Sequence, residues 1–380
     1  MLHDAELHYL DNAATTIVAP EVAEAIHTAM LTHWANPSSL YTPGAHSELE
    51  LNKARAAVAR TLGCTTGEVY FTGCGSESNN LALLGAVRAR GWGKRIVCTG
   101  FEHPSVTLPL ERLAQEGYDV RFVAPGPDGH VDVDRMLELV DKNTVLVAAM
   151  QVNNELGTAV DVARLAAGVK ARNSRTAVHV DGVQAWMRLP VKLANIDSYA
   201  VSGHKIHAPK GVGALYLRKG YNLEPPYLGG GQEKGMRPGT ENLPYAVGLA
   251  AAAGRLAGDL PRRHQHMAML NARLRAGLAA FPEVVINSPA DAVPEVLNFS
   301  LNVIRSETML HHLEQSKVYV SSGSACSKGA ASHTLTAMGL PARRIDTAIR
   351  ASFCAENTEA DVDALLNGLE DGLKSLTRIR

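Results

Sequence analysis

The sequence predicts an α/β protein with a seven-stranded, mainly parallel sheet in a large domain and a smaller α+β domain after it. Three observations lead to this fold class. Short apolar runs alternate with helical patterns between residues 69 and 217, a Gly/Pro-rich loop covers residues 221–242, and further strands and helices follow that loop. The 380 residues, 46% of them hydrophobic, suffice for two cores. We expect a large domain over residues 13–257, and a small domain over residues 258–380 together with residues 1–12.

The first 62 residues predict one strand and two helices. A short strand at residue 9 runs into a polar turn that ends at residue 16. Pro20 then opens a helix through about residue 31, because proline suits the first turn of a helix. A longer helix is expected from about residue 47 to residue 62, where apolar residues recur about once per turn.

Seven apolar runs then alternate with helical patterns. Parallel sheets with helices on both faces bind ligands beyond the carboxyl ends of their strands, so polar residues directly after the strands are candidates for a site. The strands are expected at residues 69–72, 95–99, 120–124, 144–152, 176–181, 198–202 and 213–217, and the helices at 79–89, 104–116, 133–140 and 162–172.

The second domain begins after a connecting Ala-rich helix at about residues 244–256. Its pattern mixes strands and helices without regular alternation, which favours an α+β arrangement. Strands are expected near residues 284–287, 296–301 and 319–321, and helices near 307–315, 343–349 and 358–378.

Composition excludes several classes of function. The chain has 37 basic and 38 acidic residues, so nothing indicates binding to nucleic acid or to an anionic membrane. Its five cysteines are an odd number without CxxC spacing, which argues against a disulfide scaffold or a zinc site and indicates a reducing compartment. The N-terminus lacks an apolar signal core and no run approaches 18 apolar residues, so we expect a cytoplasmic protein with no membrane segment.

Two residues after neighbouring strands indicate a specific chemistry. Lys205 lies in a turn with His, Ser and Gly, and Asp181 ends the preceding strand. A desolvated lysine becomes a neutral amine that can condense with an aldehyde. Pyridoxal phosphate needs such a lysine and a carboxylate that keeps its ring nitrogen protonated. Each residue alone is more often a surface lysine or a strand-end cap, but the pair favours this cofactor.

Further single residues are weaker candidates. Ser76 lies at a helix start after a glycine turn, where backbone amides can bind a phosphate. His103 follows another strand and could exchange protons, although a lone loop histidine is usually only polar. Arg350 could bind a carboxylate through two parallel hydrogen bonds. Cys326 lies among small polar residues and could be a mobile thiol, whereas Cys98 lies within an apolar strand and is expected to be part of the core.

The runs SGHKIHAPKGVGALY and VHVDGVQA resemble the cofactor-lysine region of the cysteine desulfurase family, in the class-V aminotransferase branch of the fold type I pyridoxal phosphate enzymes. The resemblance extends in order from YLDNAATT to the last helix. It implies that Lys205 binds the cofactor, that Asp181 pairs with the ring nitrogen and that His103 stacks on the ring as an acid/base residue. The other implied cofactor contacts are Gly75, Ser76, Asn154, Gln184, Ser202, His204 and, from a partner subunit, Thr240, which implies a homodimer.

The stretch SSGSAC separates the desulfurases from related transaminases and implies that Cys326 is the nucleophile. The loop after Cys326 is slightly shorter than in better-known members, which affects how this residue reaches its acceptor. Arg350, with Asn36 of the NPSS loop, is implied in binding the substrate carboxylate. Cys74 and Gly75 depart from the usual SGATESNN, and Ala351 and the segment 353–355 depart from the usual pocket wall.

The resemblance implies that sulfur is removed from L-cysteine, leaving L-alanine and a persulfide on Cys326 that passes to a sulfur-acceptor protein. Iron–sulfur cluster assembly, tRNA thiolation and DNA sulfur modification are all open as destinations. No metal site is expected, apart from an iron–sulfur contact through Cys326. The alternatives are an aminotransferase, which would not need Cys326, a selenocysteine lyase, which the SSGSAC form disfavours, and a non-enzymatic scaffold.

Overall fold

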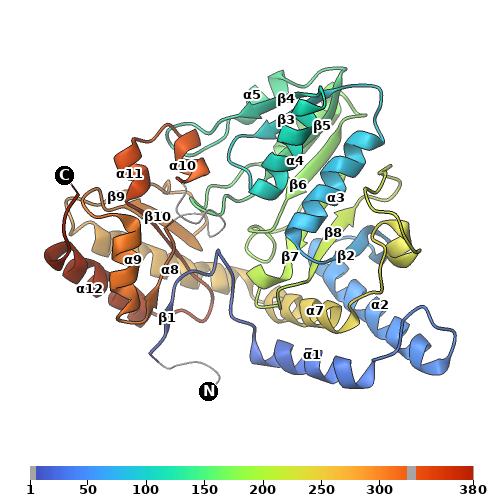
Figure 1. Ribbon diagram of the computed structural model, residues 1–380, viewed down its shortest axis with the longest axis horizontal. Helices are drawn as coiled ribbons and strands as arrows, with labels where there is room; N and C mark the ends of the chain where they lie inside the picture. Colours follow the sequence, from blue (N-terminus) through green and yellow to red (C-terminus); the bar gives the residue numbers. More distant parts are fainter. Residues whose placement is uncertain (1–5, 323–330, 380) are drawn as a thin grey trace.

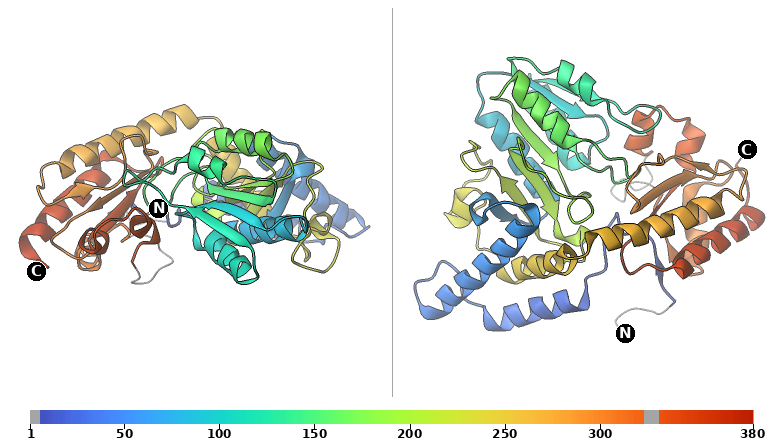
Figure 2. Two further views of the ribbon diagram at one scale, coloured as in Figure 1. Left: turned by 90° about the horizontal axis from the view of Figure 1, so that it is seen from above. Right: turned by 180° about the vertical axis from the view of Figure 1, so that it is seen from behind.

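The computed structural model describes residues 6–322 and 331–379. Figure 1 shows a larger body built around a sheet and a smaller body that holds the C-terminus. The long helix α8 (Leu260–Leu278) runs from the larger body along the smaller one, as the view from behind in Figure 2 shows. No described helix is long and apolar enough to cross a membrane.

The large body contains the expected seven-stranded sheet, and the expected α/β fold is confirmed. The strand order is β2-β8-β7-β6-β5-β3-β4, and only β8 runs antiparallel to its neighbours. All seven residues of β5 are buried, as expected for a parallel sheet covered on both faces. The strands are β2 (Val69–Thr72), β3 (Arg95–Thr99), β4 (Asp119–Val123), β5 (Thr144–Met150), β6 (Ala177–Asp181), β7 (Ser198–Ser202) and β8 (Gly213–Leu217).

Helices cover both faces of this sheet (Figure 2). One face packs against α3 and α4, with an apolar cluster that includes Leu81, Leu83 and Leu110. The other face packs against α5, α6 and α7, and α1 and α2 lie on α7. The bounds are α1 (Pro20–Thr32), α2 (Thr42–Leu62), α3 (Gly75–Arg88), α4 (Pro104–Gln115), α5 (Val133–Glu138), α6 (Val162–Arg172) and α7 (Leu243–Ala257).

The small body has its own sheet and core. The antiparallel sheet β12-β10-β9 packs against α8, α9 and α12, and Leu10 from the N-terminal segment joins this core. Single bridges from Asp11 to Ser352 and from Ser321 to Arg350 connect β12 to the parallel pair β1–β11. The elements are β1 (His8–Tyr9), β9 (Val285–Ile286), β10 (Val296–Ser300), α9 (Ser306–Glu314), β11 (Val318–Tyr319), α10 (His333–Ala337), α11 (Ala342–Asp346), β12 (Ala348–Ser352) and α12 (Glu359–Ser375). The domain boundaries at residues 12/13 and 257/258 stay a prediction.

One expectation for the C-terminal part of the chain was wrong, and one helix there was not expected. The helix expected at residues 343–349 ends at Asp346, and residues 348–352 form β12, whose five residues are all buried and pair with β10. The sequence analysis also missed α8, although its Met267, Leu270 and Leu274 recur at helical spacing.

Candidate active site

A cavity of about 200 Å³ lies at the edge of the sheet where β2, β5, β6 and β7 end at their carboxyl termini. Most of the predicted site residues line it together. They are Gly75, Ser76, His103, Asn154, Asp181, Gln184, Ser202, His204, Lys205 and Arg350. The cavity therefore gathers groups from distant parts of the chain, from Ala13 near the N-terminus to Arg350 in β12.

Lys205 ends the short 3-10 helix η2 (Gly203–Lys205) that directly follows β7. Its Nζ donates to the backbone oxygens of Ala13, at 2.6 Å, and Ala14, at 2.7 Å. These carbonyls belong to the N-terminal segment, so the lysine joins that segment to the sheet edge. The ammonium is held at the cavity wall rather than in open solvent.

Asp181 is the last residue of β6 and is buried. Its Oδ1 accepts from the backbone N–H of Val183 at 2.9 Å, and its Oδ2 accepts from Nδ2 of Asn79 at 2.8 Å. Both carboxylate oxygens accept a hydrogen bond, so the group is held from two sides. The site thus presents an oriented carboxylate to the cavity.

His103 is the N-cap residue of α4, and its Nδ1 accepts from the backbone N–H of Ser105 at 3.1 Å. Burial lowers the pKa of His103, and the positive charge of Lys205 lowers it further. The negative charge of Asp181 acts in the opposite direction but does not cancel this shift. The imidazole is therefore biased toward its neutral form. A helix N-terminus also disfavours a positive charge.

The start of α3 forms one end of the cavity. No side chain caps this helix, and its N-cap Cys74, Gly75 and Ser76 all line the cavity. Oγ of Ser202 is buried there without a hydrogen-bond partner among the described residues. Burial lowers the pKa of His204 to about 4, so this residue is neutral at pH 7. The uncapped amides and the unpaired hydroxyl suit an anion.

Arg350 lies in β12 and its side chain is 1% exposed. Its Nη2 donates to Oδ1 of Asp11 at 2.7 Å and its Nη1 donates to the backbone oxygen of Asn154 at 3.0 Å, whereas Nε is buried without a partner among the described residues. Gln184 donates from Nε2 to the backbone oxygen of Ala13 at 2.8 Å and accepts from Arg188. The guanidinium of Arg350 is thus fixed from two sides, by Asp11 and by the backbone of Asn154.

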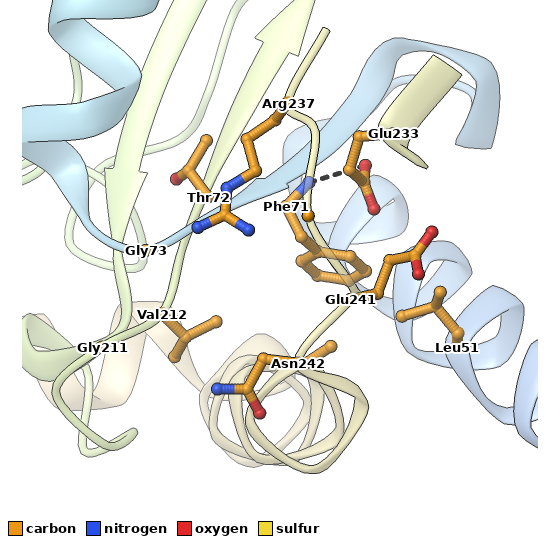
Figure 3. Close-up of a pocket in the computed structure, with 12 residues that line it drawn as sticks. Leu51, Phe71, Thr72, Gly73, Gly211, Val212, Glu233, Arg237, Glu241 and Asn242 are labelled. Carbon is orange, nitrogen blue, oxygen red and sulfur yellow. Dashed lines mark hydrogen bonds between the residues drawn. The ribbon is translucent and has the colours of Figure 1, made fainter. Parts of the chain in front are cut away.

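Three predicted site residues do not line this cavity. Asn36 is exposed in the loop between α1 and α2, and Thr240 is exposed in the Gly/Pro-rich loop. Figure 3 shows another, smaller pocket that this loop forms against β2, with Arg237 and Glu241 of the loop among its lining residues. Cys326 lies outside the described residues. The roles expected of all three stay predictions.

The sequence analysis missed several residues of the cavity. Cys74, Asn79, Ser105, Met150 and Val183 also line it. Most of them could have been predicted from their place in the sequence, because they lie at or shortly after the ends of β2, β3, β5 and β6. The carbonyls of Ala13 and Ala14 carried no signal, since any residue supplies a backbone oxygen. Cys98 is buried, as its place in an apolar strand indicates.

The fold and the cavity define an α/β enzyme scaffold with a lysine, a carboxylate and an uncapped helix start at the carboxyl edge of its main sheet. The family model for class-V aminotransferases matches residues 8–365. A cysteine desulfurase of Trichormus azollae is 38% identical over 374 residues, covering 97% of this chain and 93% of the relative. The chain therefore belongs to the class-V aminotransferase family.

Solved structures agree with this assignment. A structure described as a NifS-like protein superposes with a TM-score of 0.91 at 36% identity, covering 97% of this chain and 99% of the other. A structure described as SspA in complex with cysteine has a TM-score of 0.81 at 29% identity, covering 92% of this chain and 99% of the other. The fold type that the resemblance implies is confirmed.

Proposed function

We propose that this protein is a pyridoxal phosphate-dependent cysteine desulfurase that transfers the sulfur of L-cysteine to Cys326. The observation that carries the proposal is the joint placement of Lys205, Asp181 and Arg350 around one cavity. Family membership and the cysteine desulfurases among the relatives support it. The motif SSGSAC around Cys326 supports the choice of nucleophile.

The residues present fit pyridoxal phosphate. The uncapped start of α3 and the unpaired hydroxyl of Ser202 suit its phosphate, and Asp181 suits its ring nitrogen. His103 would lie against the ring, and Asn154 and Gln184 would contact its phenolate oxygen. When bound, the cofactor would accept the electron pair that forms at the substrate's α-carbon.

The chain's own groups divide the remaining work. Arg350, oriented by Asp11, would bind the substrate carboxylate with its remaining donors. Lys205 would take the α-proton through Nζ. The thiolate of Cys326 would attack the substrate sulfur, so that the carbon–sulfur bond breaks while a sulfur–sulfur bond forms. In sum, L-cysteine and the enzyme thiol would give L-alanine and an enzyme persulfide, which a sulfur-acceptor protein then consumes.

The deciding experiment measures sulfide and alanine released from L-cysteine in the presence of a thiol reductant. We expect both products in equal amounts from the wild type and none from Cys326→Ser, with the cofactor absorbance band retained in the variant. Cys74→Ser is a necessary comparison, because Cys74 is a second thiol that lines the cavity. Cys64→Ser, a thiol outside the cavity, is the matched control.

Other outcomes would assign a different function. If Cys326→Ser keeps full activity and Cys74→Ser loses it, the nucleophile is Cys74. Amino-group transfer to a keto acid without sulfide would show an aminotransferase. Activity on selenocysteine alone would show a selenocysteine lyase, and a protein without cofactor absorbance would contradict the proposal altogether.

We also propose a homodimer in which Thr240 contacts the phosphate bound by the partner subunit. Thr240 is exposed and lies in a loop that does not reach the cavity of its own chain. The test co-expresses two inactive variants, the double variant Thr240→Ala/Arg237→Ala and the single variant Lys205→Ala. A mixed dimer has one intact site, so the co-expressed protein should regain part of the activity. Mixed protein with no regained activity would contradict shared sites.

A further inference from the structure

We infer that a one-way chain of hydrogen bonds holds His103 in the neutral tautomer with its proton on Nε2, and that Asn79 and Ser105 are the positioning residues that impose this tautomer. The five side chains of this chain, which we call the tautomer relay, are Ser198, His179, Asn79, Ser105 and His103. The relay starts in the buried sheet and ends in the cavity. Its relevance to catalysis rests on the proposed function, but the tautomer does not.

Asp181 sets the direction of the relay. Its Oδ2 is a hydrogen-bond acceptor, and the group of Asn79 that lies 2.8 Å from it is the Nδ2 donor. The other end of the Asn79 amide is then its oxygen, which lies 3.0 Å from Nε2 of His179. His179 must therefore carry its proton on Nε2.

The buried end of the relay is consistent with this direction. His179 is fully buried, and burial lowers its pKa to about 3, so it is neutral and has one protonated nitrogen. With the proton on Nε2, its Nδ1 accepts from the hydroxyl of Ser198 at 2.9 Å. Each of these groups has one possible role, so no alternative arrangement satisfies them all.

The cavity end leads to His103. Asn79 Nδ2 also donates to Oγ of Ser105 at 2.9 Å, which leaves the Ser105 hydroxyl hydrogen for Nδ1 of His103 at 2.8 Å. The backbone N–H of Ser105 independently donates to the same Nδ1 at 3.1 Å. Two donors therefore point at Nδ1, so this nitrogen cannot carry a proton and the neutral ring is protonated on Nε2.

This arrangement changes the role expected of His103. Forming the imidazolium would place a third hydrogen between Nδ1 and two donors, at a helix N-terminus, where a positive charge is disfavoured. Among the described residues, the charge of Asp181 favours the imidazolium and that of Lys205 disfavours it. His103 would act as a neutral N–H donor through Nε2, and the proton acceptor would be Lys205.

The test is nitrogen NMR of the full chain labelled at histidine, with and without pyridoxal phosphate, and with His103→Asn to assign the signals. At pH 7 the wild type should show His103 Nδ1 as an unprotonated acceptor and Nε2 as protonated. Ser105→Ala leaves only the backbone N–H of residue 105 to donate to Nδ1, so it should raise the pKa of His103 and weaken the preference for the tautomer protonated on Nε2. Ser105→Thr should restore the wild-type signals. Asn79→Leu should resemble Ser105→Ala.

Asn80→Ala is the matched control. Asn80 is the next residue of α3, and its side chain donates to the backbone oxygens of Ser76 and Ser105, so it lies outside the tautomer relay. A protonated Nδ1 in the wild type, or identical signals in Ser105→Ala and Ser105→Thr, would overturn the inference. If Asn79→Leu does not fold, the two Ser105 variants still decide it.

These readouts separate the inference from the proposed function, because the tautomer is observed without substrate. In the active enzyme, the acid limb of the pH profile for kcat/KM should move to higher pH in Ser105→Ala and not in Ser105→Thr. A protein that shows the expected tautomer but releases no sulfide would retain the relay and lose the proposed function.

Discussion

Gly75 shows how a single residue shapes the start of α3, where the cofactor phosphate is proposed to bind. A Cβ atom at this position would lie 2.7 Å from Cγ2 of Val183 and 3.3 Å from Cβ of Ser202. The first contact is shorter than real Cβ atoms make and the second is tight, and Val183 is β-branched and cannot rotate away freely. The alanine that is usual in SGATESNN would therefore clash with valine at position 183 in this chain.

We predict that Gly75→Ala destabilises the protein by about 1–3 kcal/mol, the usual cost of overpacking. Urea unfolding of Gly75→Ala, Val183→Ala and the double variant should show that the added methyl costs little once Val183 is shortened. Gly254→Ala is the control, because a Cβ atom there meets nothing within 4 Å in helix α7. Equal costs at both glycines would contradict this account.

Glu102 is a buried acid beneath the site. Its Oε1 accepts from Oγ of Thr99 and from the backbone N–H of Met150, whereas Oε2 is buried without a partner among the described residues. Burial, aided by the charge of Asp181, raises the pKa of Glu102 to about 8. Because the folded pKa exceeds the unfolded value, the stabilisation is present at low pH and disappears as pH rises through about 8.

Glu102→Gln should therefore make stability less sensitive to alkaline pH. Between pH 6.5 and pH 9 the wild type should lose about 2 kcal/mol more free energy of unfolding than the variant. Urea titrations of both proteins at the two pH values measure this difference. Parallel losses would show that Glu102 is already ionised at pH 6.5.

At the scale of elements, one buried ion pair attaches the Gly/Pro-rich loop to the sheet. Glu233 in η3 (Gln232–Gly235) accepts from Arg55 of α2 at 2.6 and 2.8 Å and from the backbone N–H of Phe71 in β2 at 2.9 Å (Figure 3). Arg55 also lies 4.8 Å from the centre of the Phe71 ring. The loop that carries Thr240 is thereby fixed at the edge of the sheet.

Glu233→Ala should cost about 3–5 kcal/mol, because it leaves the largely buried Arg55 guanidinium without its carboxylate and the backbone N–H of Phe71 without this acceptor. Chemical unfolding gives the cost, and limited proteolysis within residues 229–242 should become faster. The double variant Arg55→Met/Glu233→Met should be less destabilised than Glu233→Ala. A single variant within about 0.5 kcal/mol of the wild type would show that this pair does not hold the loop.

The elements also show what the sequence could and could not predict. The sheet of the large domain was predictable because its strands are short apolar runs between turns, such as Arg95–Thr99. Strand β12 was not, because its five residues contain Arg350 and it follows a charged segment, so only pairing with β10 makes it a strand. Helix α8 was not expected for a different reason. Most of its residues are polar, and its few apolar residues indicate a helix only when their spacing is compared with the helical repeat.

At the scale of the whole molecule, the N-terminal segment connects the two bodies at the site. The backbone oxygens of Ala13 and Ala14 accept hydrogen bonds from Lys205 of the large body. The carboxylate of Asp11 accepts a hydrogen bond from Arg350 of the small body. The polar residues of the cavity were predictable from their places after strands, but this connection depends on backbone oxygens and on chain order in space. Motifs locate a site of this kind, and packing determines how its groups are oriented.

A charged cluster behind the site links the same two bodies. Glu356, after β12, accepts from Arg255 of α7 and lies 3.5 Å from Nε2 of His207, and Arg255 also contacts Glu21 of α1 at 2.6 Å. Burial alone would raise the pKa of Glu356, but His207, Arg255 and the Cys354 thiol together hold it below the ordinary value. Because the folded pKa is lowered, the stabilisation is present above the unfolded pKa and disappears as pH falls.

Glu356→Gln should therefore lower the free energy of unfolding at pH 7, and the difference from the wild type should shrink only as pH falls below the ordinary carboxyl pKa of 4.5. Urea unfolding at about pH 7, 4.5 and 3 measures this convergence. Glu370→Gln is the control, because Glu370 pairs with Lys374 on the exposed face of α12 within one domain, and such pairs contribute little. A deficit that stays constant with pH would mean that Glu356 stabilises the junction by packing, whereas convergence would identify its charge as the link between the two bodies.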